Sequence, residues 1–332
     1  MPRVTISEVA AAAGVSIATA SKALNGTASI APDTVRRIQH AAETLGYKPN
    51  RAAQLLAGKN KHIGILMPSE PEPIFALFEA GLTASLAGYE EYGFRPTLVK
   101  YDPTDAAAAF CEGLAKLHDI HGLIFIGQTQ LTPIADALRA MKLPKVSLQV
   151  AADESLCPSV TIDERGVGRI AAEFLSLTCK TAAVIVGDGS VTIHRRNVEG
   201  FREEAARHGL AVTAIYESFD RFDTAEALTE QLIASGCPDG IFVSSYVAPA
   251  VCACLQAHGL AGTVRVIGVD IWEKSAACLE GGTLTAAICQ NQQLQAMRAV
   301  DMLVSMMRGD APSGGILIKP ELVMPSALRY SM

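Results

Sequence analysis

The first side chains that could do chemistry share one face of a short helix expected over residues 17–24. They are small or polar apart from the first of them, and they are Ile17, Ala18, Thr19, Ser21 and Lys22. A preceding helix is expected to begin at Thr5, whose spacing to Glu8 is that of a capping box, and Gly14 separates the two helices. This is the helix-turn-helix pattern, whose second helix can enter a DNA groove. The stretch alone fits a helical hairpin in a protein core equally well.

The distribution of charge favours the first of these interpretations. The whole chain of 332 residues carries a net charge of −6, which by itself argues against a nucleic-acid partner. Residues 1–61 nevertheless hold eight Lys and Arg against three Asp and Glu, and the rest of the chain is acidic. A basic head on an acidic body is expected when only the head contacts phosphates.

Motifs for catalysis and metal binding are missing from the sequence. It contains no GxSxG, no Walker loop and no glycine fingerprint after a strand, and no Ser, His and Asp set stands out. Cys252 and Cys254 are two positions apart on an expected helix, where their side chains diverge, and no CxxC occurs. We therefore expect eight reduced thiols, no metal, no cofactor and no enzyme activity.

Composition and length limit the class of protein. A hydrophobic content of 49% with Gly and Pro spread along the chain indicates a globular protein of two or three domains. The chain shows neither the pattern of a signal peptide nor an apolar run of the roughly 18 residues that a membrane span needs. We expect a cytoplasmic, nucleoid-associated protein with no membrane partner.

Three segments follow one another along the chain. A third short helix, beginning at Pro32 and ending at Gly46, completes an all-α headpiece. The short helical run over 51–57 predicts a hinge that folds only against a partner. From His62 onward, apolar strands alternate with amphipathic helices, which predicts parallel, doubly wound α/β sheets. We expect two similar lobes, with the chain passing between them near residues 160 and 290. Such lobes bind ligands at the carboxyl ends of their strands.

Specific stretches then resemble a known family. Three stretches are similar to the corresponding segments of the lactose-repressor/galactose-repressor (LacI/GalR) family of transcription regulators. They are VTISEVAAAAGVSIATASKALNG, GYKPNRAAQLLAGK and IGILMPS. The resemblance covers the whole chain. It implies a helix-turn-helix headpiece over 1–46, a hinge linker and hinge helix over 47–60, and a two-lobed domain over 61–332. That last domain would resemble periplasmic sugar-binding proteins, bind an effector and form a dimer.

The resemblance also implies which residues contact DNA. The second helix would enter the major groove, where Ile17 and Ala18 suit thymine methyl groups and Lys22 can donate to guanine, without the two-pronged fork of the Arg that the family usually has. The hinge would enter the minor groove, where Leu56 would separate a base step. Two hinges must meet at one step, which implies a homodimer on a near-palindromic operator. The implied contacts are Thr5, Ser16, Ile17, Ala18, Thr19, Ser21, Lys22, Asn25, Thr34, Asn50, Ala53 and Leu56.

For the effector, the resemblance implies residues that follow strands or open helices. Asp270 and Gln290 match the Asp and Gln that grip sugar hydroxyls, and an aromatic ring fits the apolar face of a sugar. Asn197 stands at a position that is often Arg, so either Arg195 or Arg196 could reach the ligand. Ser245 and Tyr246 replace a common Asn-Asp pair. The implied set is Ser69, Phe75, Gln128, Asp163, Arg195, Arg196, Tyr246, Asp270, Trp272 and Gln290.

Several functions remain open from the sequence. The leading hypothesis is a transcriptional regulator, usually a repressor, controlled by a sugar or a sugar derivative. A regulator that responds to a purine or a nucleoside is the alternative within the family. The alternatives outside it are a solute-binding protein without DNA activity and an α/β enzyme. The basic headpiece and the missing signal-peptide pattern oppose the first, and the missing catalytic motifs oppose the second.

Overall fold

The computed structural model describes residues 4–24, 30–45, 47, 60–128, 130–311 and 314–330. The chain divides into two compact units, one made of residues 1–61 with residues 89–94, and one made of residues 62–88 with residues 95–332. Of the hinge predicted over 47–60, only Tyr47 and Asn60 belong to the described residues.

The N-terminal unit contains the three predicted short helices, α1 (Ile6–Ala12), α2 (Ile17–Leu24) and α3 (Pro32–Thr44). Their inward faces share an apolar core made of Val9, Ala10, Ala13, Ala20, Ala23, Ile38 and Ala42. Gly14 turns the chain between α1 and α2 with a φ of 62°, a left-handed conformation that favours glycine. At the start of α1, the Glu8 carboxylate accepts hydrogen bonds from the Thr5 amide (2.6 Å) and hydroxyl (2.8 Å), as the predicted capping box requires of Glu8.

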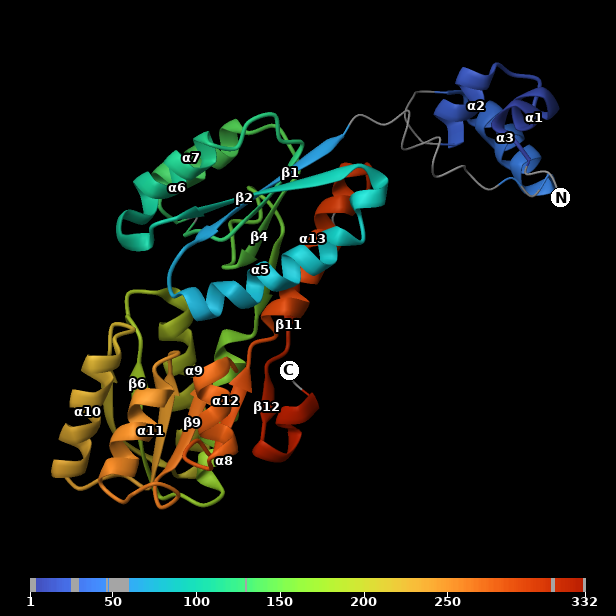
Figure 1. Cartoon of the computed structure of the whole chain (residues 1–332). Helices are drawn as coiled ribbons and strands as arrows, with labels where there is room; N and C mark the ends of the chain where they lie inside the picture. The colour runs from blue at the N-terminus through green and yellow to red at the C-terminus, as the bar shows by residue number, and fades with distance from the viewer. Residues whose placement is uncertain are drawn as a thin grey trace. The chain divides into compact units, whose positions relative to one another are not determined.

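The larger unit contains two six-stranded sheets, which define its two lobes (Figure 1). Lobe 1 is built on the strand order β11-β5-β4-β3-β1-β2 and lobe 2 on β12-β10-β9-β8-β6-β7. The strands of lobe 1 are β1 (Lys61–Pro68), β2 (Phe94–Tyr101), β3 (Gly122–Phe125), β4 (Lys145–Gln149), β5 (Ser159–Ile162) and β11 (Ile316–Ile318). Those of lobe 2 are β6 (Thr181–Val186), β7 (Ala211–Glu217), β8 (Gly240–Ser244), β9 (Arg265–Val269), β10 (Ala286–Cys289) and β12 (Glu321–Val323).

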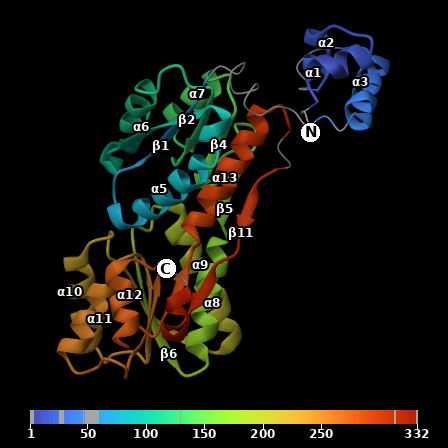
Figure 2. The same cartoon turned by 45° about the vertical axis from the view of Figure 1, so that its right-hand side comes forward.

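Helices cover both faces of each sheet, as the alternating pattern predicts. The helices of lobe 1 are α5 (Glu72–Ala87), α6 (Ala106–Ala115), α7 (Thr132–Ala140) and α13 (Gln292–Met307). Those of lobe 2 are α8 (Glu164–Ser176), α9 (Thr192–His208), α10 (Phe222–Ala234), α11 (Ala248–Ala257) and α12 (Glu273–Glu280). Helix α13 packs on α5 and on strands β3, β4 and β5, although it follows a strand of lobe 2 (Figure 2). No helix among the described residues is long and apolar enough to span a bilayer.

The path between the lobes differs from the prediction in one respect. The chain crosses after β5 and after β10, near the predicted residues 160 and 290, and it crosses once more between β11 and β12. The expectation of parallel sheets is wrong at the edge of lobe 2, because β12 pairs antiparallel with β10. A strand that arrives from the other lobe through only two residues has no crossover helix to turn it parallel.

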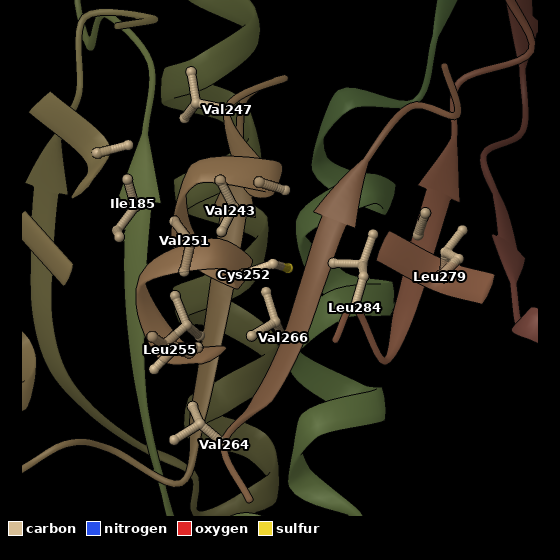
Figure 3. Close-up of a cluster of buried hydrophobic side chains, with 14 of the residues drawn as sticks. Ile185, Val243, Val247, Val251, Cys252, Leu255, Val264, Val266, Leu279 and Leu284 are labelled. Carbon is tan, nitrogen blue, oxygen red and sulfur yellow. The ribbon is translucent and has the colours of Figure 1, made fainter. Parts of the chain in front are cut away.

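The core of lobe 2 explains how α11 is oriented. Figure 3 shows Val251, Cys252 and Leu255 of α11 directed at the strands that carry Val243 and Val266. All five side chains are at most 1% exposed. Close packing of this kind fixes which face of α11 is turned to the sheet and which is left for its neighbours.

Candidate functional site

Helix α2 presents the face that the sequence predicts for DNA. Ile17 is 52% exposed, and Ala18 and Lys22 are exposed beside it. The Ser16 hydroxyl caps the helix by accepting from the Thr19 amide at 3.1 Å. On the opposite face, Ala20 and Ala23 are buried. The other predicted contacts within the described residues, Thr5, Thr34 and Ser21, lie on the surface or half-buried. Asn25, Asn50, Ala53 and Leu56 lie outside the described residues.

A second group of functional side chains lies along one edge of lobe 2. Because its five consecutive strands β6 to β10 run parallel, their carboxyl ends share that edge. Polar or conformationally special residues follow each strand, namely Gly187, Asp220, Ser245, Asp270 and Gln290. We call this edge the lobe 2 rim.

Asp270 is the most constrained residue of the rim. It is 3% exposed, and its φ of 62° is rare for a side chain other than glycine. One carboxylate oxygen accepts from Gln290 Nε2 at 2.8 Å and the other from Gln292 Nε2 at 2.5 Å. Burial raises the pKa of Asp270 to about 6, although both hydrogen bonds favour the charged form. A buried carboxyl group whose pKa is raised in this way is typical of a functional site.

The first turn of α13 holds the partners of Asp270 in place. Gln295 donates from Nε2 to the carbonyl oxygen of Gln290 at 2.7 Å. Asn291, between the two glutamines that grip Asp270, adopts a φ of 54°. Sequence reasoning found Gln290 but missed Gln292, which is buried and contacts the same carboxylate.

His194, Asp220 and Ser245 form a second polar cluster at the rim. His194 Nε2 lies 3.5 Å from Asp220 Oδ2, and the Ser245 hydroxyl donates to Asp220 Oδ1 at 2.5 Å. Burial opposes the charge on Asp220, but the hydrogen bond and charge of His194 and the bond from Ser245 hold its pKa below the ordinary value. A Cβ on Gly187 would lie 2.5 Å from both His194 Nε2 and Asp220 Oδ1, so the cluster requires glycine there.

This cluster has the residue types of a hydrolase triad but the wrong order. In a triad the imidazole stands between the hydroxyl and the carboxylate, so that it can take the hydroxyl proton. Here the Ser245 hydroxyl donates directly to Asp220, and His194 directs its Nδ1 at the Ser244 carbonyl oxygen 3.0 Å away. The arrangement leaves no imidazole to take the Ser245 proton and suits binding instead.

Three aromatic rings complete the rim. Phe222, Tyr246 and Trp272 pack edge to face or tilted, with ring centroids 5.5 to 6.4 Å apart. The Tyr246 hydroxyl donates to the Asp220 carbonyl oxygen at 2.9 Å, which joins the rings to the polar cluster. Trp272 Nε1 is buried without a hydrogen-bond partner within the described residues. An unsatisfied buried donor beside these groups is what a ligand acceptor would fill.

The predicted arginines bind partners other than the rim residues named above. Arg196 pairs with Glu164 of α8 at 3.0 Å, and Arg195 donates to the Thr192 hydroxyl at 3.3 Å. Asn197, at the position that is often Arg, is buried, and its amide is fully satisfied when its oxygen accepts from Ser244 Oγ (2.9 Å). The residue of this helix that reaches the rim is His194, which sequence reasoning passed over.

The remaining predicted effector residues have structural partners. Asp163 caps α8 by accepting from the Gly166 amide at 2.9 Å, and Phe75 is 8% exposed against Phe78. Ser69 and Gln128 are half-buried after β1 and β3 of lobe 1. Glu70 of lobe 1 adds its charge to burial and Asp220 in raising the pKa of Tyr246.

Comparison with known proteins agrees with both parts of this description. Residues 5–50 match the bacterial regulatory proteins of the lacI family, and residues 126–311 match the periplasmic binding protein domain. The HTH-type transcriptional regulator DegA of Bacillus subtilis is 28% identical over 282 residues, which cover 81% of this chain and 82% of DegA. The chain belongs to the lacI family. This lacI-family member is a DNA-binding transcriptional regulator and not an enzyme.

Solved structures share the fold of the regulator. The lac repressor dimer bound to operator and the anti-inducer ONPF matches with a TM-score of 0.67 at 23% identity, covering 97% of this chain and 98% of that one. A periplasmic solute-binding protein of Actinobacillus succinogenes with bound D-allose matches with a TM-score of 0.75 at 16% identity, covering 81% and 99%. The two-lobed fold is therefore common to regulators and to transport proteins.

Proposed function

We propose that this regulator is a repressor that binds a palindromic operator as a homodimer and responds to a sugar or a sugar derivative. In this proposal, residues 1–46 read the operator, residues 47–60 form the hinge, and residues 61–332 bind the effector and form the dimer. The observation that carries the effector assignment is the buried Asp270 gripped by Gln290 and Gln292 beside three aromatic rings.

The exposed face of α2 supports the DNA part of the proposal. Ile17 and Ala18 offer apolar contact for thymine methyl groups, and the Lys22 ammonium can donate to guanine in the major groove. One basic headpiece neutralises few phosphates and binds weakly alone. The proposal therefore includes Leu56 as a wedge in the minor groove and a second subunit that supplies the matching half.

The chemistry of the rim supports a polyhydroxylated effector. A carboxylate has more acceptor positions than the two that Gln290 and Gln292 occupy, so Asp270 can also accept from a sugar hydroxyl. The unpartnered Trp272 N–H can donate to a hydroxyl or ring oxygen. The aromatic rings suit the apolar face of a sugar, and D-allose is the ligand of the solute-binding protein with the same fold. We propose Asp220, Ser245, Tyr246, Asp270, Trp272, Gln290 and Gln292 as the effector contacts of lobe 2.

The control of DNA binding follows from linkage. An effector changes operator affinity only if it binds the two conformations of the dimer unequally, and DNA then changes effector affinity by the same factor. For an inducible repressor, the effector favours the conformation in which the two headpieces no longer match the half-sites.

The test combines a ligand screen with operator binding. Thermal unfolding of the full chain in a panel of sugars, polyols and nucleosides identifies the effector as the compound that raises the midpoint. Gel shifts with genomic fragments at fixed salt then measure operator affinity with and without that compound. We expect specific, salt-sensitive binding that the compound weakens. If the protein binds none of the genomic fragments specifically, the proposed operator binding is refuted.

Two variants separate the halves of the proposal. Lys22→Ala should lower operator affinity and leave the thermal shift by the effector unchanged. Asp270→Asn should retain operator binding and lose the response to the effector. A nucleoside as the active compound would favour the alternative effector class, for which the three aromatic rings of Phe222, Tyr246 and Trp272 are equally suited.

A further inference from the structure

Three side chains with metal-binding atoms converge on the outer helices of lobe 2. Glu230 lies on α10, Cys254 lies on α11, and His258 directly follows α11. One potential ligand atom from each side chain lies within 4.8 Å of the other two. No described group of three His, Cys, Asp or Glu other than this one has such geometry.

The fold of α11 directs Cys254 and His258 away from the sheet. Val251, Cys252 and Leu255 point into the apolar core (Figure 3). Cys254 and His258 are four residues apart and therefore share the face that borders α10. Cys254 is only 4% exposed, yet it is not part of the apolar cluster, because its thiol meets the Glu230 carboxylate. In the sequence, the nearest thiol to Cys254 is that of Cys252, whose side chain points to a different face of the helix.

The ligand atoms lie near the separations that a metal site requires. Glu230 Oε1 lies 2.9 Å from His258 Nε2 and 3.4 Å from Cys254 Sγ. Ligand atoms on a tetrahedral zinc, bound at about 2.0 to 2.3 Å, are separated by roughly 3.3 to 3.7 Å. We propose that Glu230, Cys254 and His258 bind a divalent cation of the zinc class, with solvent in the fourth position.

The ligand chemistry selects the class of ion. A thiolate and an imidazole disfavour Mg²⁺ and Ca²⁺, which prefer oxygen ligands, and favour Zn²⁺ and its neighbours. In the metal-free protein, the Cys254 thiol and the His258 Nε2–H both donate to Glu230. On binding, the metal takes the place of both protons: the thiol proton leaves to the buffer, and the neutral imidazole carries its proton on Nδ1. The Glu226 carboxylate lies close enough to act on Cys254 electrostatically, so an added positive charge meets a negative surrounding. The half-exposed His258 and Glu230 leave the site open to solvent.

The site is separate from the rim at which the effector is proposed to bind. Helix α10 begins at Phe222, a rim residue, and Glu230 lies eight residues later, which is about 12 Å along the helix axis. A metal there joins α10 to α11 and stabilises lobe 2 by binding only its folded form. Because both helices begin at rim loops, the metal also restrains the segments that carry Asp220 and Tyr246.

Cobalt spectroscopy of the full chain tests the proposal. With thiols kept reduced by a phosphine, a Co²⁺ titration is expected to saturate at one equivalent, with a sulfur-to-cobalt charge-transfer band and the visible bands of tetrahedral Co²⁺, and Zn²⁺ should displace it. Cys254→Ser should abolish the charge-transfer band. Loss of one ligand in His258→Ala or Glu230→Gln should weaken binding by at least about tenfold.

A matched control exists on α9. His208 and Glu204 form a similar pair at 3.1 Å but have no thiol beside them, so His208→Ala should leave Co²⁺ binding unchanged. Wild-type protein without the charge-transfer band, a band that survives Cys254→Ser, or an equal loss in His208→Ala would overturn the proposal. If Cys254→Ser fails to fold, the two variants at half-exposed positions decide, and Zn²⁺ should raise the unfolding midpoint of the wild type but not of His258→Ala.

Discussion

Replacing Asp270 with Asn should stabilise the regulator while removing its response to the effector. Asp270 is buried, and in the fold its charged form is disfavoured even though Gln290 and Gln292 donate to it. Asn has almost the same shape and no charge. One glutamine must rotate its amide to present its oxygen to the new nitrogen, which restores the second hydrogen bond.

The size and the sign of the effect follow from the pKa. Burial raises the pKa of Asp270 from an ordinary 3.8 to about 6, and each pKa unit corresponds to about 1.4 kcal/mol, so the ionised carboxylate costs the folded state about 3 kcal/mol. Below pH 4 the carboxyl is protonated in both states and the cost is absent. Between pH 4 and 6 the unfolded chain loses its proton first, so the cost grows, and above pH 6 it is complete.

The assay compares thermal unfolding of wild type and Asp270→Asn from pH 4 to pH 8. Near pH 8 the variant should unfold roughly 5 °C higher, and near pH 4 the two proteins should unfold together. A variant that is no more stable than wild type at pH 8, or a difference that does not change with pH, would refute the reasoning.

Asp220→Asn is the matched control at the same rim. Its carboxyl is charged at a lowered pKa because His194 and Ser245 support the charge against burial. The folded state therefore gains stability from ionised Asp220, fully above the ordinary pKa, and loses it as the pH falls through the folded value. Asp220→Asn should accordingly destabilise at pH 7, with a pH dependence opposite to that of Asp270→Asn.

Three further outcomes are expected. Leu56→Ala should lower operator affinity at least about tenfold and leave effector binding intact. An unchanged operator affinity at fixed salt would contradict the proposed insertion of Leu56 into the minor groove. Gly168→Ala should destabilise the fold by about 3 kcal/mol or more in chemical unfolding, because its Cβ would overlap the Asn197 carbonyl oxygen where α8 and α9 pack; wild-type stability would exclude this close approach. Gly187→Ala should weaken effector binding by displacing His194, with operator affinity as the control that stays constant.

Much of the architecture could be predicted from periodicity. Continuous apolar runs such as that after His62 become strands buried on both faces, and the helices between them follow from amphipathic spacing. The strands over 316–318 and 321–323 escaped prediction because three residues are too few to show a period. Their pairing partners, β5 and β10, are also more than 30 residues away in the sequence.

The residues of the lobe 2 rim could be predicted from the sequence only where they directly follow a strand. Asp270 and Gln290 follow strands directly, so the rule that parallel strands present their carboxyl ends together placed them at one edge. Gln292, His194 and Asp220 come from helix starts and a loop, where sequence spacing does not say which way a side chain turns. Arg196 illustrates the same limit. Its position suggests an effector contact, and only the fold shows that it forms an ion pair with Glu164.

Helix α13 connects the lobe 2 rim to the other lobe. Its first residue, Gln292, holds Asp270 at the rim of lobe 2, while the rest of the helix packs on α5 and on the sheet of lobe 1. The contact with α5 is close, since a Cβ on Gly81 would lie 2.8 Å from the Gln293 Cα. A ligand that moves Gln290 or Gln292 away from Asp270 therefore acts on the first turn of α13. The rest of this helix belongs to lobe 1. Because packed helices move as rigid elements, a change at the rim reaches lobe 1 without an intervening loop to absorb it.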